Sequence, residues 1–290
     1  MKVLILGSTG LLGNTIARYF FNNNSYETFA IIRDYTKISY FNKKFHKNFL
    51  LLNDVLDFEE LEIKLKEIKP DILINCLGIT NKIFRNDSKF IENYIYINSL
   101  FPHKLYQRCL YLNIRLIHFS TDCVFSGNKG FYSEKDLPDS SDIYGRSKLL
   151  GELDYDDCIT IRKSVIGHEL ISKNGLLEWF LDQTKLVQGY KNVIFSGLTT
   201  LELAWLIDEY VIPRNDLRGI LHFSGEKISK FNLLKIIREI YNKKIDIVIN
   251  EDKKIDRSLN GSKFNKLTGY KVKSWPKLIK SMYEFELLNK

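Results

Sequence analysis

The sequence predicts an α/β fold, in which a doubly wound parallel sheet is followed by a smaller α/β lobe. Short continuous apolar runs alternate with segments of helical periodicity through residues 1–163, and such runs are typical of strands buried on both faces. Strands separated by helices also imply right-handed crossovers and parallel pairing. The alternation loosens after residue 163, so we expect a main domain over 1–163 and a smaller substrate-binding lobe over 164–290, with the chain crossing between them.

The residues within each segment justify its assignment. The first run, "KVLILG", is apolar and ends in glycine, and the next segment, "LLGNTIARYFFNNN", has helical spacing and ends in asparagines. Further strands of the main domain are expected at 27–33, 48–54, 71–78 and 115–121. Its other helices are expected at 58–70, which stops at a proline, and at 87–113, with a break at Pro102. In the smaller lobe we expect helices at 174–185, 201–212 and 230–244, and strands at 219–225 and 245–251.

Composition and charge exclude several classes of protein. The chain has 290 residues, of which 44% are hydrophobic and 27% charged, as in soluble globular proteins. It has no apolar run long enough to span a membrane and no signal peptide, so we expect a cytoplasmic protein without a membrane partner. The net charge is +8, but the lysines are spread and no nucleic-acid motif is present, which favours an anionic small ligand over nucleic acid. The cysteines are too scattered for a disulfide framework or a metal site: Cys76, Cys109, Cys123 and Cys158.

Three glycines at the end of the first strand predict a dinucleotide site. They form "GSTGLLG", with Gly7, Gly10 and Gly13 between the strand and the first helix. Gly7 permits a tight turn, Gly10 lets backbone amides approach a pyrophosphate, and Gly13 allows close packing of helix and strand. The helix N-terminus then offers N–H groups and a positive dipole end to the phosphates. This arrangement is typical of a Rossmann-type domain, and the predicted contacts in the turn also include Thr9, Leu11 and Leu12.

The residue at the end of the second strand bears on the choice of cofactor. Arg33 follows Gly13 by twenty residues. An acidic residue there would bind the ribose 2′-hydroxyl of NAD, whereas an arginine suits the 2′-phosphate of NADP. We therefore predict NADP(H), although Arg33 can also be read as a solvated surface side chain and Asp34 directly follows it.

A hydroxyl and a Tyr-x-x-x-Lys pair predict the chemistry. Thr121 ends the strand at 115–121, and "IYGRSK" follows with Tyr144 and Lys148 four residues apart. Ligands of an open α/β sheet gather at the carboxyl ends of its strands, so these side chains can converge. A free tyrosine titrates near ~10, and a neighbouring ammonium favours the phenolate and lowers that pKa. The pair therefore suits proton transfer, with Thr121 bonding the substrate carbonyl or hydroxyl, although the same residues can form a polar turn into an ordinary helix.

The segment 120–152, "STDCVFSGNKGFYSEKDLPDSSDIYGRSKLLGE", resembles the dTDP-4-dehydrorhamnose reductase group of extended short-chain dehydrogenases/reductases. Those proteins carry STD-x-VF-x-G-x-x-G-x-Y-x-E leading into YGRSK-x-x-GE, and the GxxGxxG spacing at 7–13 is also similar. The resemblance implies that Thr121, Tyr144 and Lys148 are catalytic. It further implies cofactor contacts at Asp54, Val55, Cys76, Leu77, Gly78, Asn98, Tyr144 and Lys148, and substrate contacts at Thr121, Val124, Phe125 and Arg257. Asn98 resembles the asparagine that supports a proton-relay water, and it is equally suited to bending its helix.

The resemblance also implies a reaction. It is an NADPH-dependent reduction of a keto group on a nucleotide-linked deoxysugar, a precursor of bacterial surface polysaccharides, and a homodimer is compatible with it. The alternatives are a nucleotide-sugar epimerase or dehydratase that retains NAD, and a non-catalytic NADP-binding regulatory subunit like that of methionine adenosyltransferase. The smaller lobe departs from the rhamnose reductases and is similar to a sister group of sugar-nucleotide-binding reductases. There, His168 and Glu169 either contact sugar hydroxyls or serve packing and capping, and Arg257 either binds a nucleotide diphosphate or forms a surface salt bridge. Packing roles are expected for Trp179, Trp205 and Trp275.

Overall fold

The computed structural model describes residues 1–80 and 88–289. Contacts within the chain divide it into two compact units. Unit 1 comprises residues 1–120, 141–161 and 215–220, and unit 2 comprises residues 121–140, 162–214 and 221–290. The chain therefore passes between the units several times, and one passage, at 161–162, lies next to the expected boundary at 163.

The central sheet has seven strands in the order β11-β6-β5-β4-β1-β2-β3. The strands are β1 (Lys2–Leu6), β2 (Glu27–Ile32), β3 (Phe49–Leu51), β4 (Ile72–Asn75), β5 (Arg115–Thr121), β6 (Cys158–Lys163) and β11 (Gly219–His222). From β3 to β5 every neighbouring pair is parallel. The doubly wound parallel sheet is thus confirmed. The strand expected at 219–225 in the smaller lobe was assigned wrongly, because it forms an edge strand of this main sheet.

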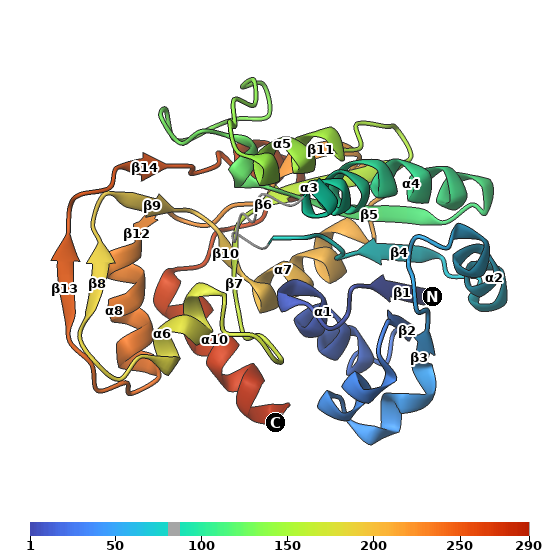
Figure 1. The fold of residues 1–290 in the computed structure, drawn as a ribbon, viewed down its shortest axis with the longest axis horizontal. Coiled ribbons are helices and arrows are strands. Elements are labelled where there is room, and N and C mark those ends of the chain that lie inside the picture. Colours follow the sequence, from blue (N-terminus) through green and yellow to red (C-terminus); the bar gives the residue numbers. More distant parts are fainter. Residues whose placement is uncertain (81–87, 290) are drawn as a thin grey trace. The chain divides into compact units, whose positions relative to one another are not determined.

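Among the described residues of unit 1 there are five helices. They are α1 (Leu11–Phe21), α2 (Phe58–Ile68), α3 (Ser88–Ile95), α4 (Phe101–Tyr111) and α5 (Ile143–Leu150). Helix α1 lies on one face of the sheet and α4 on the other (Figure 1). Apolar side chains of the strands and of α2 and α4 form a buried core, which includes Leu4, Leu73, Leu61 and Leu105. Two short 3-10 turns, Tyr35–Tyr40 and Lys43–Asn48, connect β2 to β3 and were not expected from the sequence.

The long helix expected at 87–113 is interrupted before Pro102 rather than at it. A π-helical turn, Tyr96–Leu100, separates α3 from α4, and Phe101 N–H bonds Tyr96 O across this turn. Proline has no N–H, so Pro102 cannot bond the Asn98 carbonyl four residues earlier. The backbone of Gly151 approaches that carbonyl so closely that a Cβ there would lie 1.9 Å from Asn98 O. The interruption therefore lets the end of α5 pack directly on the helix that carries Asn98.

Unit 2 is an α/β assembly of short strands and helices. The turn Asp122–Val124 opens it. Its helices are α6 (Leu176–Asp182), α7 (Thr200–Leu206, continued by a π turn to Val211), α8 (Lys230–Ile240), α9 (Ser262–Thr268) and α10 (Trp275–Leu288). Its short strands pair as β7 (Val165–Ile166) with β10 (Leu198–Thr199), β8 (Val187–Tyr190) with β13 (Ile247–Asn250), and β9 (Val193–Phe195) with β12 (Ile228–Ser229) and β14 (Ile255–Asp256). The sequence predicted α6, α7, α8 and β13 but neither α9 nor α10.

Candidate functional site

The glycine turn after β1 has the geometry that a dinucleotide requires. Gly7 has a φ of 75°, in the left-handed region that favours glycine. A Cβ at position 13 would lie 2.0 Å from Gly7 O, so no side chain fits there. Gly10 is exposed and begins α1 with no capping side chain, and the first turn of α1 has no acidic residue. This helix end therefore presents backbone N–H groups and a positive dipole end suited to a pyrophosphate.

The loops after β1 and β4 meet where the strand order reverses. A Cβ on Gly7 would lie 3.0 Å from both Cys76 C and Leu77 N, so the two loops are in contact. Asn75, the last residue of β4, holds the second loop by accepting a hydrogen bond from Leu77 N at 3.1 Å. Its Nδ2 lies 3.1 Å from Nδ1 of the buried His118 on β5. Such a reversal is where open α/β sheets bind ligands, and the structure brings the predicted Gly7, Cys76, Leu77 and Gly78 together there.

Lys148 places a buried ammonium group beside this loop. It lies on α5, which Asp142 begins by accepting a hydrogen bond from Gly145 N at 2.7 Å. Lys148 is only 4% exposed, and its Nζ lies 3.9 Å from the position of a Cβ on Gly78. Tyr144 lies one helical turn earlier on the same helix and is half-buried. The Tyr-x-x-x-Lys pair is therefore part of a helix packed on the β4 loop rather than an exposed polar turn.

Asn98 connects the β4 loop to α5. Its Oδ1 accepts from Ile79 N at 2.9 Å, and its Nδ2 donates to Ile79 O at 3.0 Å and to Ser147 Oγ at 3.1 Å. Ser147 Oγ in turn donates to Tyr144 O at 3.0 Å. Asn98 thus anchors the loop against the helix of the Tyr–Lys pair, and its role toward a relay water stays a prediction.

Sequence reasoning missed three residues that hold this helix. Ser147 bonds Asn98, and Ser99 Oγ donates to Ser147 O at 2.8 Å. Glu152, just after α5, accepts a hydrogen bond from Ser120 Oγ at 2.5 Å and so ties the helix to the end of β5. Ser147 and Glu152 lie inside the quoted motif. A polar residue next to buried positions of the helix was the signal that could have identified them.

The residues predicted to contact the adenosine part of the cofactor lie in loops of unit 1. Arg33 is exposed and directly follows β2. The neighbouring Asp34 carboxylate is engaged by Thr36, whose hydroxyl and backbone N–H hydrogen bonds lower the pKa of Asp34. Asp54 accepts from Leu56 N at 2.9 Å, and Val55 packs on the core. Their roles toward adenine and ribose stay predictions.

The remaining predicted substrate contacts belong to unit 2. Thr121 is buried, and its Oγ1 donates to Asp122 Oδ1 and accepts from Cys123 N, both at 3.1 Å. Val124 and Phe125 are fully buried, and Phe125 stacks on Tyr132 with ring centroids 4.2 Å apart. Both side chains thus lie in the interior of unit 2, and the contact of these two residues with substrate stays a prediction.

Arg257 lies beside the turn that Thr121 begins. Its Nη1 donates to Cys123 Sγ at 3.5 Å, and Cβ of an alanine at Gly127 would meet its Cγ at 3.0 Å. Its charge acts on Asp122, whose pKa is raised by burial and lowered in part by the Thr121 hydroxyl and by Arg257. Arg257 is half-buried. Contact with a nucleotide diphosphate stays a prediction.

His168 and Glu169 have structural partners within unit 2. His168 Nδ1 lies 2.6 Å from Glu178 Oε1, and its Nε2 lies 2.8 Å from Tyr241 Oη. Glu169 accepts from Gly175 N at 2.7 Å, at the residue that begins α6. Both residues line a pocket of about 330 Å³. The packing and capping roles are thus confirmed, and Trp275 is likewise buried, against Phe195.

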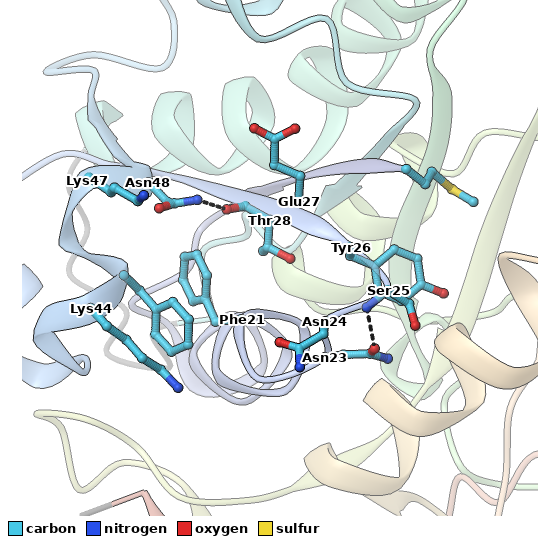
Figure 2. Close-up of a pocket in the computed structure, with 12 residues that line it drawn as sticks. Phe21, Asn23, Asn24, Ser25, Tyr26, Glu27, Thr28, Lys44, Lys47 and Asn48 are labelled. Atoms are coloured by element: carbon cyan, nitrogen blue, oxygen red, sulfur yellow. Dashed lines mark hydrogen bonds between the residues drawn. The ribbon is translucent and has the colours of Figure 1, made fainter.

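Another pocket, of about 510 Å³, lies in unit 1 (Figure 2). It is formed at the amino-terminal ends of β1 and β2, by Glu27 and Thr28 with Lys44, Lys47 and other residues of the adjoining turns. The stacked rings of Phe21 and Phe45 form part of its wall. None of the predicted site residues lines it. Because ligands of such sheets bind at the carboxyl ends of strands, this pocket is not the candidate cofactor site.

No helix of residues 1–80 and 88–289 is long and apolar enough to cross a membrane. Within the same residues, no group of three or more His, Cys, Asp and Glu side chains is placed to hold a metal ion. None of the four cysteines, all of which are described, forms a disulfide.

Comparison with known families and proteins gives consistent matches. The family model of the RmlD substrate binding domain matches residues 1–181. The probable low-salt glycan biosynthesis reductase Agl14 of Haloferax volcanii is 31% identical over 154 residues, which cover 52% of this chain and 48% of that protein. The chain thus spans about half the length of this curated relative. Subunit beta of methionine adenosyltransferase 2 from Danio rerio is 25% identical over 270 residues, covering 83% of this chain and 74% of that one.

A solved structure shows the same fold along the whole chain. The dTDP-4-dehydrorhamnose reductase of Bacillus anthracis, crystallised in complex with NADP, superposes with a TM-score of 0.77 at 21% identity. The match covers 98% of each chain. The Rossmann-like α/β architecture predicted from the sequence is therefore confirmed.

Proposed function

The chain belongs to the RmlD substrate binding domain family, and from this premise we propose that it is an NADPH-dependent reductase. Its substrate is a keto group on a nucleotide-linked deoxysugar. The reduced sugar serves as a precursor of bacterial surface polysaccharide. The names of two matched proteins, a glycan biosynthesis reductase and a dTDP-4-dehydrorhamnose reductase, support this class of reaction.

The observation that carries the proposal is the buried ammonium of Lys148 next to Gly78. A buried lysine is costly unless its charge is used or compensated. Lys148 lies on α5 beside the loop at which the cofactor is expected, one helical turn from Tyr144. An ammonium in that position favours the phenolate form of a nearby tyrosine and can hold a ribose hydroxyl.

Each proposed catalytic side chain has one task. When bound, NADPH supplies a hydride to the keto carbon. Tyr144 donates its phenolic proton to the oxygen on which negative charge develops, and Lys148 stabilises the resulting phenolate. Thr121 hydrogen-bonds the same oxygen. The remaining residues bind and orient the reactants: the glycine turn binds the pyrophosphate, and Asn98 and Ser147 hold α5 against the β4 loop.

The nucleotide part of the substrate is proposed to contact unit 2. Arg257 is half-buried beside the turn that contains Thr121, so its guanidinium is close to a predicted catalytic hydroxyl. A guanidinium binds two oxygens of a diphosphate at once. This supports a sugar carried on a nucleoside diphosphate.

A binding screen followed by turnover tests the proposal. UDP-, dTDP-, GDP- and CDP-linked sugars are added with NADPH, and thermal unfolding is followed, because ligands that bind the native state raise its stability. We expect at least one sugar nucleotide to raise Tm beyond NADPH alone. Its 4-keto derivative should then be reduced with loss of NADPH absorbance. If no sugar nucleotide raises Tm and none supports NADPH consumption, the proposal is wrong.

Replacement of Arg33 by serine should weaken NADPH binding at least tenfold and leave NADH binding nearly unchanged. A hydrogen bond to a charged group contributes about 1.5–3 kcal/mol, and exposure at this position places the effect at the lower end. Fluorescence titration with both cofactors measures it. Arg218→Ser removes another exposed arginine of unit 1, before edge strand β11, and serves as the matched control. Equal losses for NADPH and NADH would show that Arg33 does not bind the 2′-phosphate.

The first alternative is an epimerase or dehydratase that retains NAD and returns its hydride. Such an enzyme is expected to purify with NAD bound in stoichiometric amount, whereas the proposed reductase exchanges its cofactor at each turnover. We therefore expect the purified protein to release little NAD on denaturation, as measured by chromatography of the supernatant. One equivalent of tightly bound NAD would favour this alternative.

The second alternative is a regulatory subunit that binds NADP without catalysis. The match to subunit beta of methionine adenosyltransferase 2 favours it, since that match covers 83% of this chain. The presence of Thr121, Tyr144 and Lys148 favours the reductase. Dependence of turnover on the Tyr144 hydroxyl separates the two.

A further inference from the structure

The turn after β5 joins the proposed catalytic hydroxyl to a carboxylate. Thr121 Oγ1 lies 3.1 Å from Asp122 Oδ1, and it also accepts a hydrogen bond from Cys123 N at 3.1 Å. A hydroxyl has one hydrogen and two acceptor lone pairs, and an ionised carboxylate can only accept. While Asp122 is ionised, the Thr121 hydrogen therefore points to Asp122. Only one lone pair of Thr121 is left for a ligand.

This arrangement suits one oxidation state of a substrate better than the other. An alcohol can donate a hydrogen bond to the remaining lone pair of Thr121. A keto oxygen has no hydrogen and can only accept, and the negative charge that develops during reduction requires donors. With Asp122 ionised, Thr121 is therefore arranged to bind an alcohol and not to stabilise the negative charge that develops on a keto oxygen during its reduction.

The surroundings of Asp122 control its charge. Burial raises the pKa of its carboxyl, and the Thr121 hydroxyl, the charges of Arg257 and Lys163, and the Ser164 hydroxyl oppose that rise. Lys163 ends β6, and Arg257 follows β14. Asp139 also feels the charge of Arg257, although it is held separately by two hydrogen bonds from Ser126. Burial thus favours the protonated carboxyl of Asp122, whereas the two nearby cations favour the ionised form. The protonation state of Asp122 depends on the balance of these effects.

We propose that Asp122 is a positioning residue that sets the direction of the Thr121 hydroxyl. Protonated Asp122 donates to Thr121 Oγ1, which turns the Thr121 hydrogen toward the keto oxygen and forms a chain of two donors. Ionised Asp122 takes that hydrogen and leaves Thr121 as an acceptor. Asp122 keeps its proton throughout the reduction, so it adds no step to the proton balance. The inference rests on the proposed reductase function and extends it to the pH at which reduction is favoured.

The experiment compares pH profiles of kcat/KM for NADPH-dependent reduction of dTDP-4-dehydrorhamnose. In the wild type we expect reduction to fall about tenfold per pH unit above the pKa of Asp122, because one protonated group is required. Asp122→Asn should lack this decline, since its amide Nδ2 donates to Thr121 at every pH. Asp139→Asn replaces another carboxyl of unit 2 and should keep the wild-type profile. Any decline due to Tyr144 is common to all three proteins.

The opposite direction gives a second readout. Oxidation of the corresponding alcohol with NADP⁺ should rise in the wild type as Asp122 ionises, and this rise should be absent in Asp122→Asn. The inference is overturned if Asp122→Asn shows the wild-type profile in both directions. It is also overturned if Asp122→Asn is inactive at every pH while remaining folded by circular dichroism.

A titration that needs no substrate keeps the inference separate from the proposed function. The carboxyl ¹³C resonance of Asp122, assigned by its loss in Asp122→Asn, is followed against pH in the wild type and in Thr121→Val. Removal of the Thr121 donor should raise the pKa of Asp122, and an unchanged pKa would overturn the coupling. If the wild type consumes no NADPH with any sugar nucleotide, the proposed function fails, and this titration still decides whether Asp122 and Thr121 are coupled.

Discussion

Tyr144→Phe is expected to reduce NADPH-dependent turnover by about 10²–10⁴-fold while NADPH binding stays intact, because the change removes the proton donor. Tyr144 lies on α5, whose position is held by the Asp142 cap and by Ser147 through Asn98. These contacts do not use the phenol hydroxyl, so the variant should fold as the wild type does. Turnover is followed by NADPH absorbance, and binding by the quenching of tryptophan fluorescence.

Tyr111→Phe is the matched control for this prediction. Tyr111 is 74% exposed at the end of α4, so loss of its hydroxyl should leave turnover unchanged. Equal turnover by Tyr144→Phe and the wild type would exclude Tyr144 as the proton donor. If neither protein turns over any sugar nucleotide but both bind NADPH, the regulatory-subunit alternative is favoured.

Gly13→Ala is expected to abolish measurable NADPH binding and to destabilise the protein by about 1–3 kcal/mol, the usual cost of overpacking. The added methyl would lie 2.0 Å from Gly7 O and 2.7 Å from Gly7 C, so α1 and the glycine turn must separate. The N–H groups at the start of α1 then move away from the pyrophosphate. Thermal unfolding should show a lower Tm, by roughly 2–4 °C per kcal/mol, and addition of NADPH should no longer raise it.

Gly10→Ala separates an effect on folding stability from an effect on cofactor binding. A methyl at position 10 would meet Gly7 O at 3.5 Å, an ordinary contact, and Gly10 is exposed. This variant should therefore keep the wild-type Tm without cofactor and still bind NADPH more weakly, because the methyl occupies the approach of the phosphates. A wild-type affinity for NADPH in both glycine variants would show that the cofactor does not bind at this turn.

Local patterns were sufficient to predict five strands of the main sheet, β1 to β5. Continuous apolar runs such as residues 3–6 are typical of strands buried on both faces, and the glycine spacing at 7, 10 and 13 is typical of a turn that binds a dinucleotide. The smaller lobe was predicted less completely, because several of its strands have only two or three residues and carry no periodicity that a sequence reveals. Helix α10 was missed as well.

Tertiary contacts explain what the sequence did not show at single residues. Val124 and Phe125 belong to the motif that suggested substrate contacts, and only the structure shows that their side chains pack inside unit 2, where Phe125 stacks on Tyr132. Residues 219–222 were placed in the smaller lobe by their position along the chain, yet they pair at the edge of the main sheet. The break was expected at Pro102, whereas the structure has a π turn before it, at Tyr96–Leu100, where Gly151 approaches the Asn98 carbonyl.

The sequence by itself determined the parallel α/β fold, the glycine turn and the spacing of Tyr144 and Lys148, because periodicity, glycine geometry and helical spacing are local properties. Only the tertiary structure showed that Lys148 is buried against Gly78, that Asn98 and Ser147 fasten the β4 loop to α5, and that Thr121 shares its hydrogen with Asp122. Burial and hydrogen-bond partners are set by how the chain packs in three dimensions. Burial and hydrogen-bond partners decide which side chains are charged and which way their hydrogen bonds point, whereas the sequence shows only which side chains are present.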